Sequence, residues 1–142
     1  MRTVLITGAS SGFGAASARR FAARGDRVVA AARRTERLES LASELGSDLL
    51  LPVTLDVRDE ASVARLPASL PEKFAEVDVL VNNAGLALGL APAQEADVGQ
   101  WDQMIQTNCA GLVYLTRAFL PQMVARGRGH VVNLGSIAGT YP

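Results

Sequence analysis

The chain has 142 residues, 49% of them hydrophobic, and its 14 acidic residues balance its 14 basic ones. This length suits a single domain over residues 1–142, and the balanced charge argues against nucleic acid or a membrane surface as partner. The only cysteine, Cys109, excludes an internal disulfide and a cysteine-built metal site, so we expect no metal centre and a small buried side chain at this position.

The first predicted elements are a strand over Val4 to Ile6 and a helix from Phe13 to Ala23. They are joined by the turn Thr7-Gly8-Ala9-Ser10-Ser11-Gly12-Phe13-Gly14. A strand that leads through such a turn into a helix directs backbone N–H groups at an anion held at the helix N-terminus. The expected anion is the pyrophosphate of a dinucleotide, and a purely structural turn is the alternative.

The residues of this turn have separable roles. Gly8 and Gly12 can adopt backbone angles that a side chain would penalise, and they let the main chain approach a phosphate. Gly14 allows the new helix to lie close to the first strand. Ser10 and Ser11 add hydroxyl donors. The spacing differs from both G-x-G-x-x-G and the P-loop, so the turn needs support from the rest of the chain.

A second strand is predicted over Val28 to Ala32 and a second helix over Arg34 to Leu45. Arg33 and Arg34 follow the strand, about 20 residues after the glycine turn, where a fold selective for NAD places an acid for the ribose 2′-hydroxyl. Arginines instead hold a 2′-phosphate through charge-assisted hydrogen bonds, which favours NADP. The alternative is a solvated helix start.

The third strand is predicted over Leu49 to Leu55, and Asp56 and Val57 follow it directly. A carboxylate here can accept from an adenine amino group, or Asp56 can be an ordinary helix N-cap. Because Pro67 and Pro71 interrupt the next segment, we expect only a short helix and an irregular turn there.

The fourth strand is predicted over Val77 to Val81 and leads into Asn82-Asn83-Ala84-Gly85. The small pair Ala84 and Gly85 leaves room for a flat ring or a ribose against the backbone. A simple turn from Asn83 to Gly85 is the alternative.

A long helical region is predicted from Asp97 to Arg126, with Pro121 expected to bend its end. The fifth strand, His130 to Leu134, is followed by Gly135 and Ser136. The Ser136 hydroxyl can polarise a carbonyl at the reacting end of a cofactor. No acid and histidine lie nearby to form a Ser-His-Asp triad, so a hydrolase is disfavoured.

Five continuous apolar runs separated by helical segments are typical of a doubly wound, Rossmann-type parallel sheet, with helices on both faces. We expect the strand order 3-2-1-4-5 and a ligand at the carboxyl ends of the strands. The apolar run at the N-terminus is too short for a signal peptide, and none elsewhere approaches the ~20 residues of a membrane span. The sequence therefore predicts a cytoplasmic chain.

The chain carries, in order, the motifs T-G-x-x-x-G-x-G, a basic pair, D-V, N-N-A-G, a T-N on the long helix and G-S. With these motifs it resembles the short-chain dehydrogenase/reductase family over its whole length. The runs at 81–89 and 111–118 are similar to its NADP-dependent 3-hydroxy acid dehydrogenases, which act on serine and other small hydroxy acids. The resemblance implies reversible hydride transfer between NADP(H) and a secondary alcohol or ketone.

Carried over residue by residue, the resemblance implies a site built from the motifs above. It implies that the turn residues hold the pyrophosphate: Gly8, Ser10, Ser11, Gly12, Phe13 and Gly14. It implies that Arg33 and Arg34 hold the 2′-phosphate, that Asp56 and Val57 contact adenine, and that Asn83, Ala84 and Gly85 line the ribose and nicotinamide side. Asn108 would hold a water in a proton relay, or be a polar helix residue with a local bond. Ser136 would bind the substrate oxygen, or be a turn residue.

One family feature has no match. The resemblance implies an acid/base Tyr-x-x-x-Lys motif beyond the serine, but the sequence ends at Tyr141-Pro142 and its only lysine is Lys73. Tyr141 follows Ser136 too closely and has no lysine after it.

We therefore expect the chain alone to bind NADP(H) weakly and to lack turnover, and its fifth strand to be an unpaired edge. Such a fragment would need its C-terminal half, and the full-length form is expected to be a homo-oligomer. Half of a split enzyme and a non-catalytic dinucleotide-binding or interaction module are the alternatives.

Overall fold

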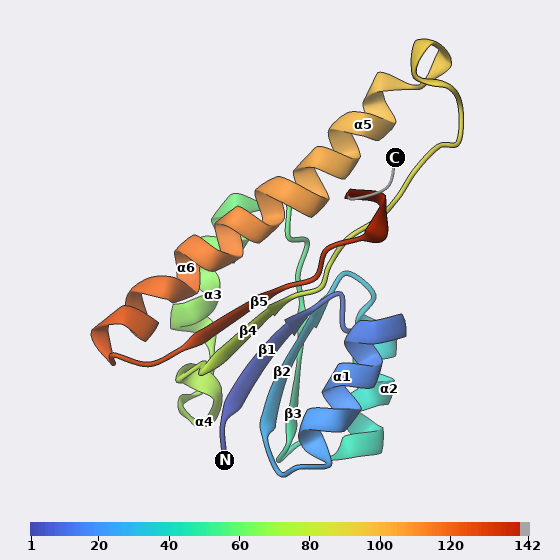
Figure 1. The fold of residues 1–142 in the computed structure, drawn as a ribbon. Coiled ribbons are helices and arrows are strands. Elements are labelled where there is room, and N and C mark those ends of the chain that lie inside the picture. The colour runs from blue at the N-terminus through green and yellow to red at the C-terminus, as the bar shows by residue number, and fades with distance from the viewer. Residues whose placement is uncertain (140–142) are drawn as a thin grey trace.

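The predicted strands form one parallel sheet in the computed structural model, which describes residues 1–139 (Figure 1). The strands are β1 (Thr3–Thr7), β2 (Arg27–Ala32), β3 (Leu50–Thr54), β4 (Val79–Asn82) and β5 (His130–Asn133). Their order is β3-β2-β1-β4-β5, and every neighbouring pair is parallel. The predicted fold class and strand order are confirmed.

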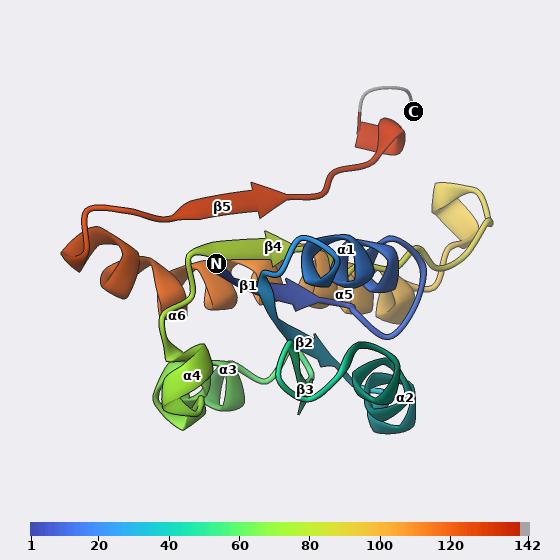
Figure 2. The same cartoon turned by 90° about the horizontal axis from the view of Figure 1, so that it is seen from below.

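Helices cover both faces of the sheet, as Figures 1 and 2 show. One face packs against α1 (Gly12–Ala22) and α2 (Thr35–Leu45). The other packs against α3 (Glu60–Ser69), α4 (Glu72–Ala75) and α6 (Gly111–Ala125). The helix α5 (Val98–Ile105) continues into α6 through the π-helical segment η2 (Gln106–Ala110), and the short 3₁₀ turns are η1 (Ala93–Glu95) and η3 (Ile137–Gly139).

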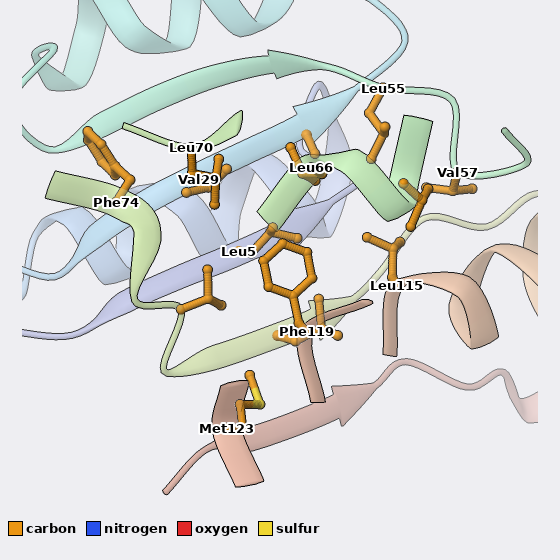
Figure 3. Close-up of a cluster of buried hydrophobic side chains, with 14 residues drawn as sticks. Leu5, Val29, Leu55, Val57, Leu66, Leu70, Phe74, Leu115, Phe119 and Met123 are labelled. Atoms are coloured by element: carbon orange, nitrogen blue, oxygen red, sulfur yellow. The ribbon is translucent and has the colours of Figure 1, made fainter. Parts of the chain in front are cut away.

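Alternate strand residues build two separate cores. Leu5 on β1 packs with Leu115 and Phe119 of α6, in the cluster shown in Figure 3. Its neighbours Val4 and Ile6 face the opposite way, into the cluster under α1 and α2. Burial on both faces explains why the strands are apolar throughout rather than alternating. The two cores fix the strand ends relative to one another, and these ends carry the predicted site.

The segment after β3 differs from its prediction. Pro67 lies inside α3, which continues to Ser69, so this proline does not end the helix. Proline removes one backbone hydrogen bond from a helix, but here Val63 and Leu66 are buried in the core and hold the helix against the sheet. Pro71 does separate α3 from α4. Tertiary packing therefore outweighs the local cost of Pro67.

The exposure of Cys109 also corrects a prediction. Its side chain is exposed on η2, although the sequence suggested a small buried residue. The α5–η2–α6 region turns Leu115, Phe119 and Met123 toward the core. Cys109 lies with the residues that this packing leaves outside. A continuous helix-length apolar segment does not by itself reveal which side is buried.

The sheet ends at β5 within the described residues, so the predicted edge strand is confirmed. Figure 2 shows β5 at the outer side of the sheet. Among residues 1–139, no helix has both the length and the apolar character needed to cross a membrane.

Candidate functional site

A cleft of about 300 Å³ opens where β1, β2, β3 and β4 end. Because the strands are parallel, these carboxyl ends all lie at the upper edge of the sheet in Figure 1. The predicted site residues that line the cleft are Gly8, Ser10, Ser11, Arg33, Arg34, Asp56, Val57, Asn83, Ala84 and Gly85. The fold therefore brings motifs from four separate strand ends into one cavity.

The remaining predicted residues lie elsewhere. Gly12, Phe13 and Gly14 form the first turn of α1, and neither Asn108 nor Ser136 lines the cleft. Four further lining residues were not predicted: Ala32, Leu55, Leu86 and Thr107. Leu86 simply extends a motif that the sequence did identify. Thr107 belongs to the T-N motif on the long helix, which was identified without placing this threonine in the cleft, and the π-helical geometry of η2 that brings it there had no signal in the sequence.

The glycine turn is shaped by close contact as well as by backbone angles. Gly8 and Gly12 have φ angles of +65° and +53°, where side chains other than glycine are strained. A Cβ on Gly14 would clash with the carbonyl oxygen of Gly8 and lie 2.6 Å from Asn83 Nδ2. The turn thus holds α1 against β1 at a distance that only glycine permits.

Thr7 and Asn83 join the glycine turn to β4. The Asn83 side-chain amide donates to the carbonyl oxygen of Thr7 at 2.8 Å. In return, the Thr7 hydroxyl accepts from the backbone N–H groups of Asn83 and Ala84 at 3.0 and 2.9 Å. Asn83 lines the cleft, but its side chain also holds two of the cleft walls together. The sequence identified Asn83 without this cross-strand role.

Arg34, the N-cap of α2, reaches back to the glycine turn. Its guanidinium donates to Ser10 Oγ at 3.1 and 2.9 Å and to Ser11 Oγ at 2.7 Å. The alternative that Arg34 is only a solvated residue at the start of α2 therefore does not describe its contacts. Ser11 is the N-cap of α1 but makes no side-chain capping bond, which leaves the first N–H groups of the helix to another acceptor.

Asp56 is held as a carboxylate inside the cleft. Arg58 hydrogen bonds are the main cause of a lowered Asp56 pKa, and the nearby charge of Arg33 adds a smaller effect. Asp56 does not cap α3, because Asp59 occupies that position and accepts from the Ser62 N–H at 3.1 Å. The N-cap alternative for Asp56 is therefore wrong.

Asn108 anchors η2 to the chain that follows β4. Its amide donates to the carbonyl oxygen of Leu86 at 2.8 Å, and its Oδ1 accepts from the Leu86 N–H at 2.9 Å. This contact spans 22 positions of sequence, so the alternative of a local bond is wrong. The side chain positions one wall of the cleft, and its role in holding a water stays a prediction.

Ser136 lies after β5, next to the start of η3. Its Oγ accepts from the Ala138 N–H at 3.1 Å, which is the turn role that the sequence allowed. A serine hydroxyl that accepts one bond still has its own hydrogen to donate. Tyr141 lies outside the residues that the structure describes.

These features suit a nucleotide that carries several phosphates. An uncapped helix N-terminus and close backbone approach suit a pyrophosphate, and two arginines beside it suit a further phosphate. The carboxylate of Asp56 suits a hydrogen-bond donor such as an amino group.

Comparisons with known proteins agree with this geometry. The family model for short chain dehydrogenases matches residues 2–142. An NADP-dependent 3-hydroxy acid dehydrogenase from Salmonella typhi is 55% identical over 139 residues, 98% of this chain and 56% of the relative. A serine 3-dehydrogenase from Rhizobium radiobacter is 48% identical over 140 residues, 99% of this chain and 55% of the relative.

A solved structure described as the closed form of serine dehydrogenase complexed with NADP⁺ matches with a TM-score of 0.96 and 52% identity. The match covers 99% of this chain and 56% of that one. The chain thus spans about half the length of the curated relatives that it matches.

Proposed function

This chain belongs to the short chain dehydrogenase family, and we propose that it forms the NADP-binding part of an oxidoreductase acting on a small hydroxy acid or another secondary alcohol. The observation that carries the proposal is the meeting of the glycine turn, the Arg33-Arg34 pair and Asp56 in one cleft. A dinucleotide with a 2′-phosphate has complementary groups for all three.

Each part of the cofactor has a proposed contact. The N–H groups at the start of α1 would hold the pyrophosphate, and Ser10 and Ser11 would contribute hydroxyl donors. Arg33 and Arg34 would hold the 2′-phosphate, with Arg34 sharing or exchanging its present serine contacts. Asp56 would accept from the adenine amino group, and Val57 would pack against the base.

The chemistry would take place beyond Ala84 and Gly85. NADP(H), when bound, supplies reversible hydride transfer. Ser136 would donate its hydroxyl hydrogen to the substrate oxygen and so orient it. Asn108 would keep the cleft wall in place and hold a water. The names of the relatives support a small 3-hydroxy acid as substrate.

We also propose how much of the protein is needed for turnover. Residues 1–142 would form one NADP-binding domain that needs a C-terminal half for turnover. The unmatched Tyr-x-x-x-Lys motif supports this expectation. A cytoplasmic location and a small-molecule substrate, rather than nucleic acid, belong to the same proposal. A split enzyme would gain activity when a second polypeptide is added, and a non-catalytic module would not.

Homo-oligomerisation is proposed through α5 and α6. Large apolar side chains are exposed along this helical region: Val98, Trp101, Ile105, Val113, Leu120 and Val124. Residues three, four or seven positions apart lie on the same side of a helix, and the π-helical segment η2 adds one residue to this spacing. These side chains therefore form one stripe, on the side away from Phe119 and the core. A second copy of the chain could bury this stripe.

Fluorescence titration with NADPH and NADH tests the proposed cofactor. The wild-type chain is expected to bind NADPH more tightly than NADH, and Arg33→Ala/Arg34→Ala is expected to lower this preference by about tenfold or more. The affinity for NADPH should fall more than that for NADH, because NADH has no 2′-phosphate. An unchanged affinity ratio in the double variant would refute the arginine assignment, and no binding of either cofactor would refute the proposed function.

A turnover assay tests the extent of the active unit. The chain with its mass of 14.9 kDa should bind the cofactor, yet neither reduce the ketones with NADPH nor oxidise small 3-hydroxy acids with NADP⁺. Turnover by the isolated chain, at a mass verified by mass spectrometry, would show that the unmatched motif is not required.

A further inference from the structure

Asp56 and Arg58 form the most fully bonded ion pair at the edge of the cleft. Arg58 Nη2 donates to Asp56 Oδ2 at 2.6 Å, and Arg58 Nε lies 3.0 and 3.1 Å from the two carboxylate oxygens. The backbone N–H of Arg58 also donates to Oδ1 at 3.0 Å. A planar guanidinium bound in this way fixes the plane of the carboxylate.

The hydrogen bonds to Asp56 leave room for one more donor. A carboxylate has about four acceptor positions. Arg58 supplies three hydrogens to them: its backbone N–H and Nε–H reach Oδ1, and its Nη2–H reaches Oδ2, with Nε also 3.1 Å from Oδ2. The side chain of Asp56 is 32% exposed and lines the cleft, whereas Arg58 reaches it from outside the lining. The remaining acceptor position is therefore available to a ligand in the cleft.

We propose that Arg58 is a positioning residue for recognition of the nucleotide base. The proposal rests on the proposed binding of NADP(H) in this cleft. By fixing Asp56 from behind, Arg58 leaves it able to accept one hydrogen bond in one direction. At the 6 position, a 6-aminopurine offers the required donor, whereas a 6-oxopurine presents an oxygen that the carboxylate repels and carries its nearest donor, N1–H, at a different place on the ring. Arg58 thus contributes to selection of adenine without touching it.

Freeing the carboxylate should weaken this selection. Without the bidentate contact, Asp56 can rotate and turn toward solvent, so ordering it on ligand binding costs conformational entropy. Lysine keeps the positive charge but cannot make the same planar two-point contact. A role through net charge alone would affect both bases equally, whereas a positioning role changes the preference between them.

The test compares NADPH with its hypoxanthine analogue, in which an oxygen replaces the adenine amino group. Both carry the same fluorescent reduced nicotinamide, so both dissociation constants are measured in the same way on the 142-residue chain. The wild type is expected to bind NADPH about tenfold more tightly than the analogue, because this is the effect of losing one hydrogen bond to a charged group. In Arg58→Met the preference should fall to about twofold or less, mainly through weaker NADPH binding.

Two further variants separate the possible outcomes. Arg65→Met removes a guanidinium that donates to the Ser62 hydroxyl and, within the described part of the chain, does not line the cleft, and it should leave the base preference unchanged. Arg58→Lys should show a reduced preference. Thermal unfolding checks that each variant is folded. A wild-type preference retained in Arg58→Met or fully retained in Arg58→Lys would overturn the proposal, as would a wild type without preference. A chain that binds neither dinucleotide would overturn the proposed function and this inference with it.

Discussion

At the scale of single residues, the cleft depends on contacts between groups far apart in the chain. Gly14 could be assigned to close packing from sequence, because glycine after such a turn has few other purposes. The partners that require it, the Gly8 carbonyl and the Asn83 amide, become visible only in three dimensions. The same holds for Arg58, which looks like an ordinary charged residue until its contact with Asp56 is seen.

Gly14→Ala tests the close approach of α1 to β1. The added methyl group would push against backbone, so we expect unfolding to become easier by about 1–3 kcal/mol and NADPH binding to weaken with it. Denaturant unfolding and fluorescence titration measure the two effects. Gly135→Ala is the matched control, because no atom of residues 1–139 lies within 4 Å of its added Cβ. Equal stability of the two variants would contradict the packing role.

At the scale of elements, apolar periodicity predicted the ends of each strand to within two residues. Local sequence signals failed where tertiary packing determines whether a helix continues or a side chain is buried. Pro67 was expected to interrupt its segment, yet the core contacts of Val63 and Leu66 carry α3 through it. Cys109 was expected to be buried, yet η2 exposes it. Neither outcome could be read from neighbouring residues, because each depends on which face of a helix meets the sheet.

The connection from α1 to β2 is tied to the start of β1 by a pH-sensitive contact. Asp26 is buried and accepts from the Arg2 backbone N–H at 3.0 Å and from its guanidinium at 2.9 Å. Side-chain hydrogen bonding to Arg2 is the main cause of its lowered pKa. Because the folded pKa lies below the unfolded value, the stabilisation is complete above about pH 4 and is lost as the pH falls through the folded pKa.

Asp26→Asn should therefore lower the free energy of unfolding by about 1–2 kcal/mol at pH 7 and much less at strongly acidic pH. Urea unfolding over a range of pH values measures this difference. Glu44→Gln is the control, because its pair with Arg19 is about half exposed and should contribute much less to stability than the buried Asp26. A penalty for Asp26→Asn that stays constant down to acidic pH would contradict the assignment.

The exposed stripe on α5 and α6 leads to a prediction about assembly. Ile105 and Val113 are 56% and 59% exposed, and a charge on each should prevent burial between two copies. We expect Ile105→Glu/Val113→Glu to shift the chain toward the monomer in light scattering coupled to size-exclusion chromatography. Ala64→Glu, on the exposed side of α3, should have no such effect. Identical masses for the wild type and the double variant would contradict the proposed interface.

At the scale of the whole molecule, the order of the strands determines the site. The motifs are spread from Gly8 to Gly85 in sequence, but parallel pairing places all of them at one edge of the sheet. This arrangement was predictable because the β-α repeat implies it. The contribution of η2 was not, since a π-helical segment depends on how α5 and α6 pack.

A map of amide chemical shifts in the ¹⁵N-labelled chain during titration with NADP⁺ tests directly whether the cofactor binds in the cleft. We predict saturable changes at the carboxyl ends of β1 to β4, in the glycine turn and at Arg33, Arg34, Asp56 and Ala84. Changes centred on another surface, such as the exposed stripe of α5 and α6, or no saturable changes at all, would contradict NADP⁺ binding in the cleft.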